Sequence, residues 1–121
     1  MHAVAQTHAF TRAAADAGMT DAEISNLISF LAENPMAGVE LQGTGGCRKL
    51  RIAGHGKGKS GGYRVVTFYS GEAIPVFLLT VFSKGEKSNI SKAEAIGLKQ
   101  VTKAIVDEYR ARIAEVTKKG A

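Results

Sequence analysis

Lysine and arginine side chains gather in the middle of the sequence. The stretch between Glu40 and Glu72 contains no acidic residue and six cationic ones: Arg48, Lys49, Arg51, Lys57, Lys59 and Arg64. The rest of the chain has ten Lys or Arg residues against eleven Asp or Glu residues, so the net charge of +5 is +6 here and −1 elsewhere. Ammonium and guanidinium groups bind phosphate oxygens, and a local excess of them attracts polyanions. The sequence therefore predicts that a polyanion binds at one place on the protein.

A glycine-rich loop separates two strand-like runs inside this stretch. The loop covers residues 54–62 and contains five glycines and two lysines. Lys57 and Lys59 are two positions apart, so both point to one side of an extended backbone. The glycines allow turns with positive φ and a close approach of the backbone to a ligand, and Arg64 offers a planar fork for a phosphate. We interpret the loop as a basic hairpin tip that contacts a sugar–phosphate chain. The alternative is a solvated loop with scattered charge.

Two nucleotide-binding motifs match this loop only by letter. Gly58-Lys59-Ser60 is the end of a Walker A motif, but position 53 is Ala53 where the first glycine is needed, and a strand follows instead of a helix. The spacing of Gly56, Gly58 and Gly61 matches a dinucleotide fingerprint without a surrounding βαβ unit. Neither nucleotide site is predicted.

Three further residues have side chains that can do chemistry. His55 is either a general acid or base near neutral pH or an exposed loop histidine. Cys47 begins a strand and is interpreted as a small buried side chain, not a nucleophile. Lys84 follows the end of a strand, where it either completes a ring of cations or is a surface lysine.

The composition is that of one folded domain. The chain has 121 residues, 45% of them hydrophobic and 22% charged, with a sequence pI of about 9.5. Its single cysteine excludes an internal disulfide, and its three histidines lack the spacing of a structural metal site, so no metal or other cofactor is expected. No apolar run reaches membrane-spanning length and no signal peptide opens the sequence, so a cytoplasmic protein without membrane association is expected.

The first third of the chain predicts a short strand and a helical hairpin. The strand is expected over 3–8 with Val4 inward, and the first helix over 10–17, ended by Gly18. Thr20 and Glu23 have the spacing of a capping box, and Asn34-Pro35 stops the second helix. Met19 and the leucines of this hairpin are expected to be core. The segment 39–41 is predicted to be a short extended link.

The remainder predicts a three-stranded antiparallel meander and a long helix. Leu50 and Ile52 alternate with Lys49 and Arg51, which indicates a strand with one apolar and one basic face. Strands follow over 63–69 and 75–82, the last with apolar residues on both faces. A second capping box at 91–94 starts the helix, whose expected apolar stripe is Leu98, Val101, Ile105, Tyr109 and Ile113. Residues 115–121 are expected to be a frayed tail of a single domain, 1–121.

Three sequence blocks resemble a known family: GTGGCRKLR at 43–51, GKGKSGGYR at 56–64 and FLLTVFSKGE at 77–86. Over roughly residues 4–110 the chain is similar to the RelE/ParE superfamily of type II toxins, in particular its HigB-like branch. The resemblance implies an α+β RelE-like fold: an antiparallel or mixed sheet made of the N-terminal strand and the meander, with the helical hairpin and the long C-terminal helix. It also implies a bacterial, cytoplasmic toxin whose partner is a cognate antitoxin encoded beside it, a helix-turn-helix protein through which alone it reaches operator DNA.

RelE- and HigB-type members cut messenger RNA on the ribosome without a metal. The resemblance therefore implies that a 2′-hydroxyl attacks the adjacent phosphate, leaving a cyclic phosphate and a free 5′-hydroxyl. Lys57 and Lys59 match the family's loop lysines, Arg64 matches the arginine that holds the scissile phosphate, and Lys84 matches the lysine that ends the last strand. The residues expected to contact RNA around them are Arg48, Lys49, Arg51, His55, Tyr63 and Phe82.

The chain departs from the family pattern at the expected proton donor. Phe82 stands where many relatives have tyrosine, and Gly85 and Ile90 fall near the places of an arginine and a C-terminal tyrosine. His55, Tyr63 or a lysine would then serve as the general acid. Two alternative functions remain: a ParE-like toxin that inhibits a DNA topoisomerase without catalysis, and a non-catalytic antitoxin-binding corepressor. The lysine cluster favours the endoribonuclease, because a topoisomerase inhibitor does not require it.

Overall fold

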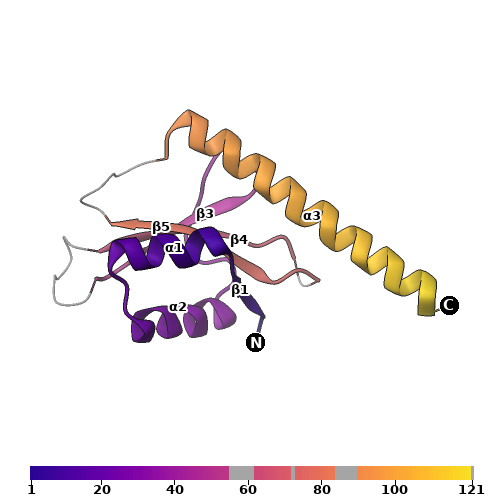
Figure 1. Cartoon of the computed structure of the whole chain (residues 1–121), viewed down its shortest axis with the longest axis horizontal. Coiled ribbons are helices and arrows are strands. Elements are labelled where there is room, and N and C mark those ends of the chain that lie inside the picture. Colours follow the sequence, from indigo (N-terminus) through magenta and orange to yellow (C-terminus); the bar gives the residue numbers. More distant parts are fainter. Residues whose placement is uncertain (55–61, 72, 84–89, 121) are drawn as a thin grey trace.

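A computed structural model describes residues 1–54, 62–71, 73–83 and 90–120, with side chains described up to residue 114. Within these residues the chain forms five strands and three helices (Figure 1). In chain order they are β1 (Val4–Gln6), α1 (His8–Ala17), α2 (Asp21–Glu33), β2 (Val39–Glu40), β3 (Cys47–Ile52), β4 (Tyr63–Phe68), β5 (Val76–Ser83) and α3 (Lys92–Gly120). The predicted order of elements is confirmed.

The strands form one mixed sheet in the order β1-β5-β4-β3-β2. β1 pairs with β5 in parallel, and the other neighbours are antiparallel. The predicted α+β fold with a mixed sheet, a helical hairpin and a long C-terminal helix is therefore confirmed. One detail differs: the segment predicted to be a link contributes β2, because Val39 and Glu40 pair with Lys49 and Arg48 at the sheet edge.

The helical hairpin is delimited by the predicted caps. The α2 N-terminus has both bonds of the capping box: Glu23 N–H donates to Thr20 Oγ1 over 3.1 Å, and Thr20 N–H donates to Glu23 Oε1 over 2.9 Å. Gly18 ends α1 with φ of 81°, a left-handed conformation that favours glycine. Asn34 ends α2 directly before Pro35.

The sheet has helices on both faces, and each face has its own apolar core. In Figure 1, α1 and α2 lie on one side of the sheet and α3 lies on the other. Strand alternation sends Leu78 and Val81 of β5 into the core beneath α1 and α2, and Leu79 and Phe82 into the core beneath α3. The prediction that the last strand has apolar residues on both faces is therefore confirmed. A register shift beside Thr67 adds one residue to β5, which leaves Leu79 on the α3 side.

The long helix α3 packs against the sheet through residues between Leu98 and Tyr109. Leu98 and Ile105 join the core, Thr102 is 3% exposed, and the Tyr109 ring contacts the edge of Phe77. The predicted stripe is wrong at Val101 and Ile113, which are 44% and 46% exposed. Ile113 belongs to the second half of α3, and this half of the helix extends past the sheet (Figure 1).

The helix extends to Gly120, through the residues where a frayed tail is expected. Among the described residues, none of the helices combines the length and apolar character that crossing a membrane requires.

Candidate nucleic-acid interface

Two arginines lie directly opposite each other on neighbouring strands. Arg51 of β3 pairs with Arg64 of β4, and Arg64 pairs in turn with Phe82 of β5. Directly opposed residues of an antiparallel pair share a face, with Cβ atoms typically about 5 Å apart. Because Phe82 belongs to the core beneath α3, both arginines project from the α3 side of the sheet. Arg51 is exposed and Arg64 is half-buried.

This arginine pair is electrostatically unfavourable by itself. Like charges directly opposite each other destabilise a sheet. Among the described residues, neither guanidinium forms an ion pair, and Arg64 Nη1 donates only a long bond of 3.4 Å to the backbone oxygen of Tyr63. Lys49 lies two positions before Arg51 on the same face, opposite Val66. An anion placed between the arginines would relieve their repulsion, and a phosphate matches the guanidinium fork.

Apolar residues pack next to the arginine pair on the same face of the sheet. Phe82 is 4% exposed and packs with Val66 and Leu79 in the core on the α3 side. The ring predicted to contact RNA is therefore mostly covered by protein, next to Arg64. Its position favours supporting the Arg64 side chain over broad stacking on a base.

Tyr63 lies on the opposite face from the arginines. Its side chain is 5% exposed within the core beneath α1 and α2, and its hydroxyl lies 3.4 Å from both Gly18 O and Glu23 Oε1. Burial, and then the Glu23 carboxylate, raises the pKa of this hydroxyl. Tyr63 therefore lies on the other face of the sheet from the arginines with which it was predicted to contact RNA. The contacts of its hydroxyl connect the β3–β4 hairpin to the start of α2.

Arg48 is also separated from the arginine pair. It is opposite the buried Thr67, on the face that carries Leu50, and its Nη1 donates to Gly38 O over 3.2 Å. The alternation that was predicted for Leu50 and Ile52 against Lys49 and Arg51 is confirmed, because the two apolar residues pack against the core beneath α1 and α2.

Cys47 is a buried structural residue, as predicted. It is fully buried, its backbone N–H donates to Thr44 Oγ1 over 3.0 Å, and burial raises the pKa of its thiol to about 11. At neutral pH this thiol is protonated, which disfavours nucleophilic chemistry.

The remaining predicted site residues, His55, Lys57, Lys59 and Lys84, lie outside the described residues, and their roles stay predictions. The strand positions that bound their segments are aligned: Ile52 pairs with Tyr63, and Tyr63 pairs with Ser83. Ile52, Tyr63 and Ser83 therefore lie at one end of the sheet, next to the arginine pair. Among the described residues, no three His, Cys, Asp or Glu side chains come together to hold a metal ion.

The pairing of Arg51 with Arg64 was not recognised in the sequence, although a signal for it exists. Each arginine is the second strand residue counted outward from the glycine-rich loop, after Ile52 on one side and Tyr63 on the other. A symmetric hairpin therefore places them opposite each other.

The comparison with protein families agrees with the fold. The model of the RelE family, described as the RelE toxin of the RelE/RelB toxin–antitoxin system, matches residues 2–121. The match spans the helical hairpin, the meander and the C-terminal helix, and so includes both arginines. The chain belongs to the RelE family and is a toxin of a type II toxin–antitoxin system.

Proposed function

We propose that this toxin is a ribosome-dependent endoribonuclease that cuts messenger RNA and so inhibits translation. The observation that carries the proposal is the direct opposition of Arg51, which is exposed, and Arg64, which is half-buried, on one face of the sheet. Two guanidinium groups held side by side without an acidic partner among the described residues suit a phosphodiester.

In the proposed reaction, the 2′-oxygen of a ribose attacks the adjacent phosphorus, and the bond from phosphorus to the 5′-oxygen breaks. Negative charge grows on the non-bridging oxygens in the transition state. Arg51 and Arg64 stabilise that charge, and Lys49 adds to the local positive potential. A base takes the 2′-proton and an acid gives one to the leaving 5′-oxygen. The candidates for these two roles are the predicted residues Lys57, Lys59, Lys84 and His55.

The finer assignments are part of the same proposal. The cations carry the electrostatic role, so the reaction is proposed to need no metal ion. The protein is proposed to act in the bacterial cytoplasm, within the HigB-like branch, with the ribosome and messenger RNA as targets. A cognate antitoxin with a helix-turn-helix domain is the proposed inhibitor and the link to operator DNA.

Induction of variants in cells tests the proposal. Arg51→Ala with Arg64→Ala should abolish growth arrest and the discrete messenger RNA cuts mapped by primer extension. Loss of one transition-state donor typically lowers the rate by about a hundredfold or more. Arg48→Ala is the matched control, because Arg48 is on the same strand but the opposite face. A double variant that still arrests growth and cuts RNA would overturn the assigned site.

The same experiment separates the alternatives. A topoisomerase inhibitor would induce a DNA-damage response with intact messenger RNA. A non-catalytic corepressor would change neither growth nor RNA. Either pattern would contradict the nuclease.

A further inference from the structure

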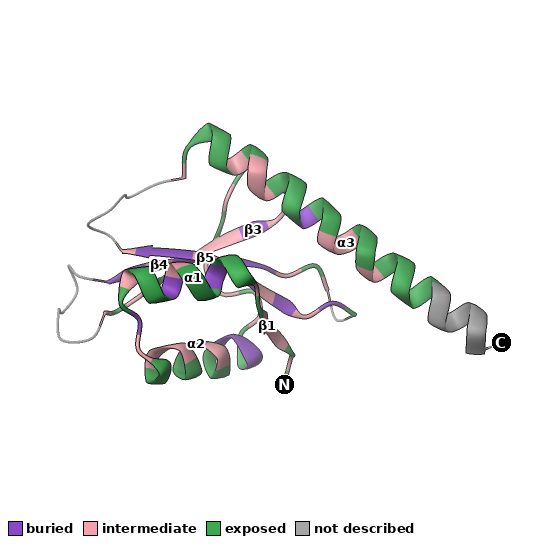
Figure 2. Cartoon of the chain, viewed as in Figure 1, coloured by how far each residue is buried: buried purple, intermediate pink, exposed green. Residues whose placement is uncertain are grey.

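A pocket opens between α3 and the turn that precedes β3. It has a volume of about 480 Å³, and it is lined by Gly45 of the turn and by six residues of the helix: Lys99, Thr102, Lys103, Val106, Asp107 and Arg110. The six lie three or four positions apart, so they form one side of α3. Most of α3 is exposed in Figure 2, and the pocket is therefore open to solvent.

A contact between the turn and the helix forms the floor of this pocket. Thr102 Oγ1 donates to Thr44 O over 3.2 Å and to Lys99 O over 2.9 Å, and both threonines are buried. A Cβ at Gly45 would lie 2.5 Å from Thr102 Oγ1, so only glycine allows the turn to come this close to the helix. The backbone positions that carry the charged side chains of the pocket are therefore fixed relative to the sheet.

The charged side chains of the pocket are mainly cationic. Three cations, Lys99, Lys103 and Arg110, accompany a single acid, Asp107, so the pocket has an excess of two positive charges. Lys103 forms an exposed ion pair with Asp107 over 2.8 Å. Among the described residues, Lys99 and Arg110 have no acidic partner. Ammonium and guanidinium groups in this arrangement suit the oxygens of a phosphate.

The pocket lies on the same face of the sheet as the arginine pair. Cys47 directly follows the turn and belongs to the core beneath α3, and strand alternation places Lys49 and Arg51 on that face as well. From Cys47 to Arg51 the strand spans about 13 Å. This is about four nucleotides at the roughly 3.4 Å spacing of phosphates along one strand of a duplex. Cations are therefore present at both ends of this span, and Lys49 lies at its middle.

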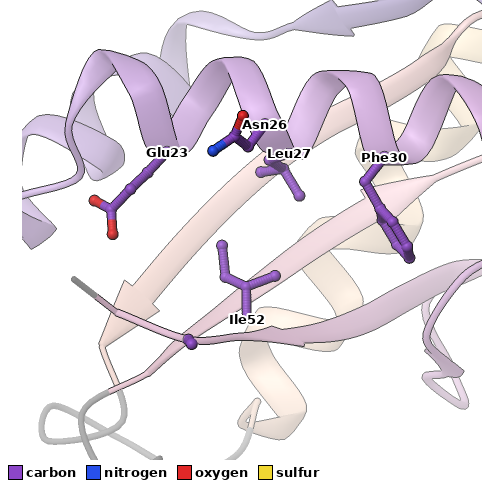
Figure 3. Close-up of a pocket in the computed structure, with 6 residues that line it drawn as sticks. Glu23, Asn26, Leu27, Phe30 and Ile52 are labelled. Carbon is purple, nitrogen blue, oxygen red and sulfur yellow. The ribbon is translucent and has the colours of Figure 1, made fainter. Parts of the chain in front are cut away.

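Another pocket, between α2 and the end of β3, has the opposite character. Its lining contains the acid Glu23 and the apolar Leu27, Phe30 and Ile52, and no Lys or Arg (Figure 3). The carboxylate of Glu23 would repel a polyanion. Of these two pockets, only the one beside α3 suits RNA.

We propose that the pocket beside α3 binds a phosphate group of the single RNA strand that is cut at the arginine pair. Lys99 and Arg110 contact the phosphate oxygens, and Lys103 exchanges Asp107 for the phosphate. This exchange costs little, because an exposed ion pair contributes little to stability. The inference rests on the proposed function and adds to it a preference for RNA long enough to reach both sites.

RNA affinity measured against RNA length tests the site. The full-length protein is titrated with single-stranded 2′-O-methyl RNA, which lacks the attacking hydroxyl, of about four and about twelve nucleotides. Lys99→Gln with Arg110→Gln should weaken binding of the longer RNA by about tenfold. The slope of log K against log salt should fall by about 1.4, because each phosphate contact to a single strand contributes about 0.7. The shorter RNA reaches only one site at a time, so its affinity should fall much less.

Arg12→Gln with Arg112→Gln is the matched control. It removes the same charge from exposed positions on α1 and α3 that do not line the pocket, and it should bind the longer RNA as the wild type does. Equal losses in the two double variants would reduce the effect to net charge and overturn the proposal. Unchanged affinity in the Lys99 and Arg110 variant would overturn it as well. Circular dichroism and thermal melting verify that each variant is folded.

Two further measurements distinguish a free anion from RNA, and the pocket from the nuclease. If inorganic phosphate stabilises the wild type more than the Lys99 and Arg110 variant while RNA affinity is the same, the pocket is a free-phosphate site and the proposal is wrong. In an Arg51→Ala, Arg64→Ala background, the pocket substitutions should still lower the remaining affinity for the longer RNA. A protein that passes this test but cuts no messenger RNA would contradict the nuclease alone.

Discussion

Neutralising Arg51 should make the protein more stable and less active. Opposed like charges cost roughly 0.2–1 kcal/mol in a sheet, and two charges about 6 Å apart in water repel by about 0.7 kcal/mol. Because Arg51 is exposed, the lower half of that range applies, and Arg51→Gln should add about 0.3–0.5 kcal/mol. A domain of this size unfolds with an entropy of about 0.25 kcal/mol/K, so the melting temperature should rise by about 1–2 °C.

Calorimetry at low and high salt measures this effect. The increase should be present at about 10 mM ionic strength and absent at 1 M, where the Debye length falls to about 3 Å. Inorganic phosphate should stabilise the wild type more than the variant. Arg48→Gln is the control: Arg48 donates to Gly38 O, so its replacement should not raise stability. A low-salt loss of stability in Arg51→Gln would refute the claim that the two arginines repel each other.

Three further predictions concern the framework of the site. Tyr63→Phe removes the buried hydroxyl that lies 3.4 Å from Gly18 O and Glu23 Oε1. Denaturant titration should therefore show a loss of about 1 kcal/mol in the free energy of unfolding. No change would mean that these contacts do not hold α2 to the β3–β4 hairpin. Gly62→Ala would place a Cβ 2.5 Å from Ile52 O, and the free energy of unfolding should fall by about 1–3 kcal/mol. Gly43→Ala is the comparison, because its Cβ would meet nothing within 4 Å and its effect reports the cost of positive φ alone. The pKa of Cys47 is raised to about 11 in the folded protein, so its contribution to stability is full below pH 9, where an unfolded thiol titrates, and is lost as the pH rises through 11. In Cys47→Ala, the loss of stability between pH 9 and pH 11 should be smaller by roughly 2–3 kcal/mol. An unchanged slope would contradict the burial of the thiol.

Local sequence rules accounted for the ends of the helices and for strand alternation. The Thr20–Glu23 and Ser91–Glu94 boxes form as their spacing predicts, because each bond joins groups within one helical turn. The core face of β3 was equally readable, since period-2 alternation needs no knowledge of the partner strand.

The sequence was less informative where the burial of a residue depends on a distant element. The predicted apolar stripe of α3 is wrong at Ile113, because helical periodicity does not indicate where the sheet beneath the helix ends. β2 was missed because two residues carry too little pattern to predict a strand, and only pairing with Arg48 and Lys49 defines it. Tyr63 was predicted to contact RNA together with Arg64, although neighbouring strand residues point to opposite faces.

The sequence alone determined that this protein is basic at one place, with a glycine-rich loop between two strands, because charge and glycine content are properties of the chain itself. Only the tertiary structure decided which cations act together. Strand register sets Arg51 against Arg64 and sends Arg48 and Tyr63 to the other face, since hydrogen bonding between strands, not proximity in sequence, fixes which side chains meet.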